Sequence, residues 1–110
     1  MPDSLPRLNG ISHIELTVSD CEQAAALWQD VMGFTQVNHV RGASLEVRSL
    51  FRAPGVVVNA MTHDQPLPGV FDERCIGLDH LAFEVSDRDE LRQWVTHLDA
   101  KGVAHQKVSR

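Results

Sequence analysis

Two histidines stand at equivalent positions of an internal repeat, and each has a glutamate nearby on the same predicted strand. The segments HIELTVSD (13–20) and HLAFEVSD (80–87) align with an offset of 67 residues and share His, Val, Ser and Asp. Because side chains alternate along a strand, Glu15 is expected on the face of His13, and Glu84 on the face of His80. Imidazole and carboxylate groups bind metal ions and transfer protons, so these four residues are the first candidates for chemistry.

An amphipathic helix is predicted after each copy of the repeat. Apolar residues recur there at positions i, i+3, i+4 and i+7, which form one face of a helix. They are Ala24, Leu27, Trp28 and Val31 after the first copy, and Leu91, Trp94, Val95 and Leu98 after the second. Ser19 and Ser86 are the expected N-cap residues, and Gly33 and Gly102 the expected left-handed ends of the helices. A strand, a tight turn and a helix therefore occur twice.

The segments after the first helix are predicted to be strands. FTQVNHV (34–40), SLEVRSLF (44–51) and VVVNAM (56–61) are apolar or alternating. They complete a β-α-β-β-β module over residues 11–61, which an irregular linker (62–77) joins to a second module (78–110). That module has its strand, its helix and the start of a strand at 103–108, with 8 residues after its helix glycine against 28 in the first. The expectation is one α+β domain over residues 1–110, with the second module incomplete.

Composition excludes several classes of protein. Hydrophobic residues make up 43% of the 110 residues and charged residues 23%, as in ordinary globular proteins. The net charge is −5 and the ten Lys and Arg residues form no run, which argues against nucleic-acid binding. No apolar stretch approaches the roughly 20 residues of a membrane span, and the N-terminus has no signal-peptide pattern. Cys21 and Cys75 are too few for a disulfide framework, so a cytoplasmic protein with reduced thiols is expected.

The paired module, with a histidine on the first strand of each copy, resembles the vicinal oxygen chelate superfamily. This superfamily includes glyoxalase I, the bleomycin- and fosfomycin-resistance proteins and the extradiol dioxygenases. The stretches that carry the resemblance are ISHIELTVSDCEQAAALWQDVMGF and GLDHLAFEVSDRDELRQWVTHLDAKGVAH. The resemblance implies two curled half-sheets around a cavity that binds a small molecule. In enzymes of the superfamily it also implies a divalent metal held by residues of the first and last strands of each module.

The ligand positions that the resemblance implies are only partly kept. His13 and His80 match the first-strand ligands, whereas Asn59 stands where a last-strand Glu is usual and is expected to line the cavity. The fourth position falls in the hairpin that the second module lacks. Glu15 and Glu84 are candidates for a catalytic base or a substitute ligand, and His63 is a further candidate. Because two imidazoles offer no charge to a divalent cation, we expect a metal (Zn, Ni, Fe or Mn) to be bound weakly or not at all.

Three functional hypotheses stay open on the sequence. The first is a metal-dependent lyase, isomerase or dioxygenase of the glyoxalase type, in which the metal stabilises an anionic intermediate. The second is a metal-free protein of the bleomycin-resistance type that binds a small molecule by shape and a few polar groups. The third is a truncated form with a vestigial site. In each case the uncovered half-sheet and the strand edge near 103–108 predict a homodimer.

Overall fold

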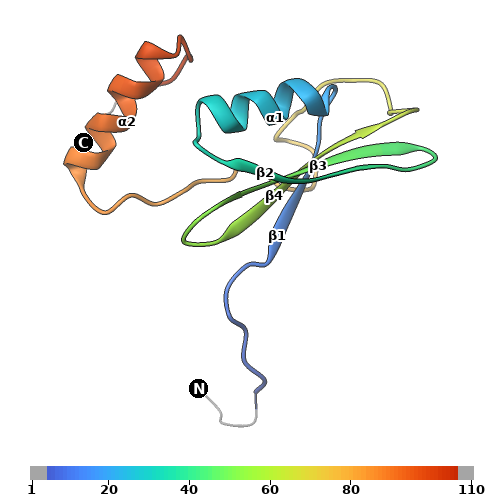
Figure 1. Ribbon diagram of the computed structural model, residues 1–110, viewed down its shortest axis with the longest axis horizontal. Coiled ribbons are helices and arrows are strands. Elements are labelled where there is room, and N and C mark those ends of the chain that lie inside the picture. The colour runs from blue at the N-terminus through green and yellow to red at the C-terminus, as the bar shows by residue number, and fades with distance from the viewer. Residues whose placement is uncertain (1–4, 107–110) are drawn as a thin grey trace. The chain divides into compact units, whose positions relative to one another are not determined.

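The computed structural model describes residues 5–106, and the chain divides into two compact units. The first, Met1–Pro66, is called the sheet unit, and the second, Leu67–Arg110, the helix unit. Figure 1 shows the elements of both. The sheet unit contains β1 (His13–Thr17), α1 (Cys21–Asp30), β2 (Thr35–Arg41), β3 (Leu45–Arg52) and β4 (Val56–His63). The helix unit contains α2 (Arg88–Ala100). The predicted α+β class is confirmed, with four strands and two helices in the described residues.

The four strands form one mixed sheet in the order β1-β4-β3-β2. β2, β3 and β4 are joined as antiparallel neighbours, while β1 pairs with β4 in parallel. The first and last strands of the module are thus adjacent although about 40 residues separate them in sequence, with Glu15 opposite Asn59. The three predicted strands after α1 are confirmed, with ends displaced by up to two residues. A bulge in β2 between Gln36 and Asn38 shifts its register against β3.

The N-cap of each helix is an aspartate, so the predicted serine N-caps are wrong by one residue. Asp20 has an extended backbone and accepts hydrogen bonds from the N–H groups of Glu22 (3.0 Å) and Gln23 (3.1 Å). Asp87 accepts from the N–H of Glu90 at 2.9 Å, and the Glu90 carboxylate accepts from the N–H of Ser86 at 2.8 Å. Aspartate and serine are both good N-caps, and which of two adjacent residues turns extended is a matter of backbone geometry that composition does not reveal.

The core lies between α1 and one face of the sheet. Its buried residues come from α1, β3, β4 and the turn after α1, and they are Cys21, Ala25, Phe34, Leu50, Val58 and Ala60. Trp28 meets Phe34 edge to face, with ring centroids 4.9 Å apart. The helix therefore turns Cys21 and Ala25 inward, whereas Leu27, predicted to share the packed face, is 53% exposed. Cys21 is a core residue, and both cysteines are free thiols.

Gly33 is expected to be sensitive to substitution because its backbone is left-handed and Arg52 lies close to it. Its φ is +73°, and an added Cβ would come 3.3 Å from Arg52 Nη1, which donates to the Met32 carbonyl at 2.7 Å. Gly33→Ala should lower the free energy of unfolding by about 1–2 kcal/mol in urea titrations. Gly102→Ala is the matched control, because φ is +70° there too, but an added Cβ meets no atom of the described residues within 4 Å. The difference between the two variants therefore measures the effect of the contact with Arg52. Unchanged stability of Gly33→Ala would contradict the expectation.

The helix unit lacks the strand that the repeat predicted in the segment HLAFEVSD (80–87). Residues 78–85 form no strand, although they repeat the apolar pattern of β1. β1 is held by a ladder to β4, and the described residues of the helix unit contain no strand that could pair with the second copy in this way. The strand predicted at 103–108 is also wrong as far as residue 106, and its end lies outside the described residues. No helix in residues 5–106 has the length and apolarity that crossing a membrane requires.

Candidate functional site

The two faces of the sheet differ in character. Leu50, Val58 and Ala60 point toward α1, so the residues between them point the opposite way. We call that opposite side the distal face. In β1 its residues His13, Glu15 and Thr17 are exposed and alternate with half-buried Ile14 and Leu16. Cross-strand register adds Val57, Asn59, Met61 and His63 from β4, and Leu45, Val47, Ser49 and Phe51 from β3.

Glu15 and Asn59 make the central contact of the distal face. They are register partners on β1 and β4, and Asn59 Nδ2 donates to Glu15 Oε1 at 3.3 Å. This bond fixes the orientation of the amide, because a carboxylate beside Oδ1 would be repulsive. Asn59 Oδ1 is buried, and no group in the described residues donates to it. A buried acceptor without a donor costs about 1–3 kcal/mol, so a hydrogen-bond donor that reaches this atom would stabilise the site.

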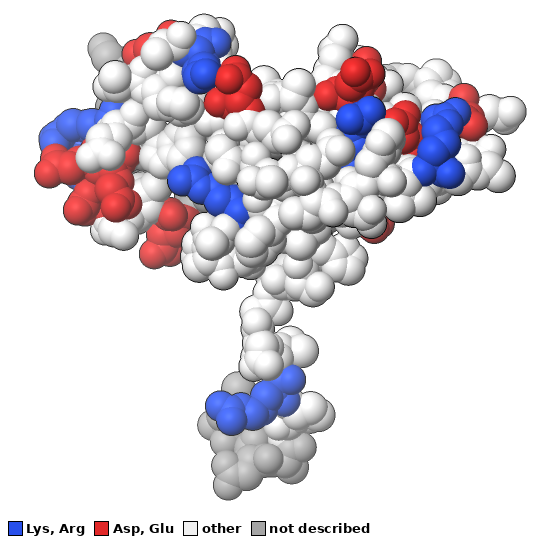
Figure 2. Space-filling view, viewed as in Figure 1, with Lys and Arg blue, Asp and Glu red and all other residues white. Residues whose placement is uncertain are grey.

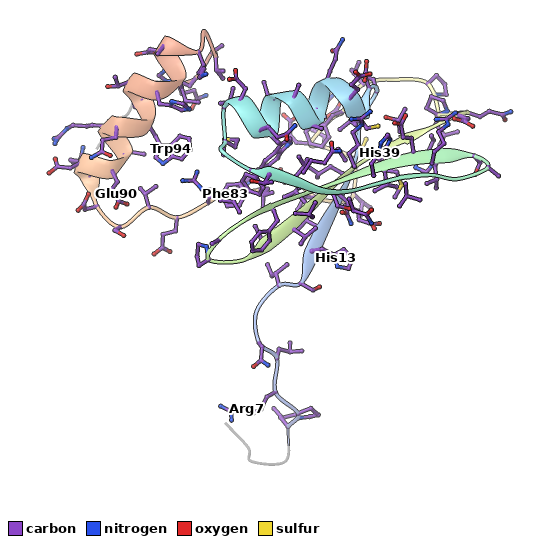
Figure 3. The ribbon with its side chains drawn as sticks, in the orientation of Figure 1. Arg7, His13, His39, Phe83, Glu90 and Trp94 are labelled. Atoms are coloured by element: carbon purple, nitrogen blue, oxygen red, sulfur yellow. The ribbon has the colours of Figure 1, made fainter. Side chains whose placement is uncertain are left out.

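His13 lies two residues before Glu15 on the same face. Its Nδ1 is 3.1 Å from the hydroxyl of Ser12, which leaves Nε2 as the ring nitrogen able to meet a ligand. Figure 3 shows His13 near the start of β1, on the side of the sheet away from α1. Ser49, which the sequence did not single out, lies opposite Asn59 on β3. The sequence could have identified Ser49 as the neighbour of Asn59 only if the register of the β3–β4 hairpin had been known.

The other two candidate residues belong to the helix unit. His80 is exposed, and its Nδ1 is 2.9 Å from Asp79 Oδ1. Glu84 is exposed as well. Since residues 78–85 form no strand, the alternation that was to put Glu84 beside His80 does not apply, and that expectation is wrong. The structure brings together His13, Glu15 and Asn59, all in the sheet unit.

These groups do not form a metal centre by themselves. The distal face offers one imidazole, one carboxylate and one amide oxygen near each other. In residues 5–106, no three His, Cys, Asp or Glu side chains are grouped so that they could hold a metal ion. Protein sites for transition metals normally use three or four ligands, so the donors of the sheet unit do not fit such a site.

A separate charged cluster lies on the α1 side of the sheet, at the β2–β3 hairpin. Glu46 Oε2 is 2.6 Å from His39 Nε2 and 3.4 Å from Arg48 Nη2, and Glu46 Oε1 is 3.5 Å from Arg41 Nη1. Arg41 also reaches Asp64 Oδ1 at 3.2 Å. Figure 2 shows these opposite charges side by side at the right-hand end of the view. The opposite charges of the cluster pair with one another, and the contacts of His39 and Arg41 with Glu46 join β2 to β3.

The charged cluster predicts a dependence of stability on pH. The hydrogen bond from His39 is the main reason why the pKa of Glu46 lies below its ordinary value of 4.5. A lowered carboxyl pKa gives stability that is present above the ordinary value and is lost as pH falls through the lowered one. In urea unfolding at neutral pH, the wild type should therefore have a higher free energy of unfolding than Glu46→Gln. This difference in stability should shrink below about pH 4. The exposed Glu73→Gln is the control, and a constant difference would contradict the assignment.

A shallow hollow of about 350 Å³ adjoins the end of β4. Its lining residues are Ala43, Ser44, His63, Asp64 and Gln65. The N–H of Asp64 donates to the Ser44 carbonyl at 2.9 Å, which closes the two chain segments against each other. His63 thus lies at the rim of the distal face and not at its centre.

Comparison with known proteins identifies the class to which this fold and face belong. The family model described as "Glyoxalase/Bleomycin resistance protein/Dioxygenase superfamily" matches residues 12–109. The chain belongs to that superfamily, as the resemblance implied. A search of curated proteins returned no significant match.

Solved structures share the fold. A glyoxylase/bleomycin resistance protein/dioxygenase domain from Frankia sp. EAN1pec is 26% identical with a TM-score of 0.84, over 94% of this chain and 82% of that one. The fosfomycin resistance protein FosX from Listeria monocytogenes, in a complex with Mn(II) and a dihydroxypropylphosphonic acid, is 19% identical with a TM-score of 0.68, over 94% and 78%. An integron cassette protein from the Halifax Harbour sewage outfall metagenome is 16% identical with a TM-score of 0.67, over 94% and 80%.

Proposed function

We propose that the chain binds a small polar molecule on the distal face, with His13, Glu15 and Asn59 as the binding groups. The observation that carries the proposal is the pair of Glu15 and Asn59, joined at 3.3 Å, in which Asn59 Oδ1 is buried and receives no hydrogen bond from residues 5–106. Such a polar group set into an otherwise apolar surface is typical of ligand sites. Val47, Met61 and Phe51 supply apolar surface around it.

The experiment follows the backbone amides of the full chain by NMR during titration with small diols, amino alcohols and hydroxy acids. Shifts should gather on distal-face residues, above all Glu15, Ser49 and Asn59. Asn59→Ala should reduce the affinity of whichever compound binds by about tenfold, the loss of one buried hydrogen bond. Leu27→Ala, which removes an exposed side chain from α1 on the other side of the sheet, serves as the control. Shifts confined to other surfaces would overturn the proposal.

A metal-assisted reaction is the second candidate, with His13 and His80 as ligands and Glu15 or Glu84 as base. It is favoured by the Mn(II) in the related FosX structure and by the two histidines at equivalent repeat positions. Removing either histidine should then abolish Ni(II) or Zn(II) binding, whereas the binding function needs only the residues of the sheet unit.

The partner we propose for assembly is a second copy of the chain. The helix unit exposes large apolar side chains at Leu67, Val70, Phe71 and Ile76, and such surfaces favour association. β1 and β2 are also edge strands of the sheet. Light scattering at increasing concentration should give the mass of a dimer. A monomer mass at the highest concentration would contradict this.

A further inference from the structure

The distal face differs from the α1 side of the sheet in the sign and placement of its charges. The sheet unit has four arginines and no lysine. Arg48 lies opposite Ala60, and Arg41 opposite Glu46, so both point to the α1 side. Arg52 reaches the Met32 carbonyl at the end of α1 at 2.7 Å, and Arg7 stands before β1. No strand residue of the distal face is Arg or Lys, and its one carboxylate is Glu15.

The α1-side arginines are also engaged with other groups. Arg48 donates to Gln36 Oε1 and Glu46 Oε2 at 3.4 Å each, and Arg41 bonds Glu46 and Asp64. These contacts draw the guanidinium groups toward the hairpin cluster. The β-sheet itself separates them from the distal face, so they cannot serve as direct partners for an anion bound there.

The two central polar groups of the distal face that could take a further hydrogen bond are both acceptors. Asn59 uses its amide N–H to hold Glu15 and leaves Oδ1 without a donor. The Glu15 carboxylate is acceptor-only and, on an exposed strand, keeps lone pairs that Asn59 does not use. A ligand that satisfies both atoms must itself donate hydrogen bonds, and a positive charge on it would be attracted by Glu15.

We infer that the ligand of the distal face is a hydroxylated amine or a neutral polyol, and not a phosphonate or another anion. The inference rests on the proposed function and adds the chemical class of the ligand. A cation about 4 Å from an exposed carboxylate gains a factor of about 3–5 in affinity over its neutral analogue, and an anion loses a similar factor. Because Glu15 and Asn59 Oδ1 accept hydrogen bonds, the site should also prefer polyols to compounds that have no hydrogen-bond donor.

Three probes of matched size test this inference: 1-amino-2-propanol, 1,2-propanediol and lactate. They are cationic, neutral and anionic at pH 8. In NMR titrations of the full chain, shifts at Glu15, Ser49 and Asn59 should saturate first with the amino alcohol and last with lactate. Lower ionic strength should widen the gap between the two charged probes.

The matched variants are Glu15→Gln and Glu22→Gln, which change the net charge equally. Glu15→Gln should remove the preference for the amino alcohol over the diol, whereas Glu22→Gln, on α1, should preserve it. Tightest binding of lactate on this face would overturn the charge inference and leave the proposed function standing. If none of the three probes perturbs the distal face, the proposed function and the inference fail together.

Discussion

Leu50→Ala is expected to lower the free energy of unfolding by about 3 kcal/mol, within the range of 2–5 kcal/mol for buried leucines. Leu50 is 0% exposed and lies opposite Val58, which is buried to the same degree. Both strands meet α1 at this point through Cys21 and Ala25. The cavity would open in the middle of the layer that attaches α1 to the sheet, so little collapse is available to relieve it.

Urea unfolding followed by tryptophan fluorescence measures this loss, because Trp28 packs against the same core. The matched control is Leu8→Ala, since Leu8 belongs to the sheet unit and is 93% exposed. That variant should stay within about 0.5 kcal/mol of the wild type. Equal effects of the two substitutions would mean that the assigned core does not hold the unit together.

The strands of the sheet unit could be predicted because each has a sequence pattern that suffices locally. VVVNAM is an apolar run bounded by Ala53-Pro54-Gly55, and the glycine at the end of α1 has the left-handed φ that its position suggested. The strand predicted from residue 80 failed for the opposite reason. It repeats the pattern of β1, but a strand forms only with a partner, and the partner of β1 is β4, four elements further along the chain.

The candidate site was accessible to the sequence only in part. Alternation alone sets Glu15 on the face of His13, and the resemblance pointed to Asn59. That Glu15 and Asn59 touch depends on the register between β1 and β4, which the sequence pattern does not specify. The bulge in β2 and the sharing of Glu46 among His39, Arg41 and Arg48 also require the folded structure. The register between strands that are distant in sequence decides which polar residues are in contact, and the sequence pattern of each strand does not specify that register.

Asn59→Glu is expected to raise the affinity for Ni(II) or Zn(II) by at least tenfold, because it sets a second carboxylate beside Glu15 and near His13. In the wild type the amide of Asn59 donates a hydrogen bond of 3.3 Å to one oxygen of Glu15. The substitution removes that donor and replaces it with an anionic oxygen, which divalent cations favour over an amide. One imidazole and two carboxylates then meet the minimum of three protein ligands.

The same substitution should destabilise the metal-free protein, since two adjacent carboxylates repel each other. Calorimetric titration of Ni(II) and Zn(II) measures the affinity, and thermal unfolding with and without metal measures the coupled gain in stability. Asn59→Gln is the neutral control and should gain no affinity. Adding Glu15→Gln to Asn59→Glu should relieve the repulsion. It should also abolish most of the gain in metal affinity, because the cation loses one of its two carboxylates. Tight binding by the wild type, or no gain in Asn59→Glu, would place the metal-ligating residues of this chain elsewhere than on the distal face.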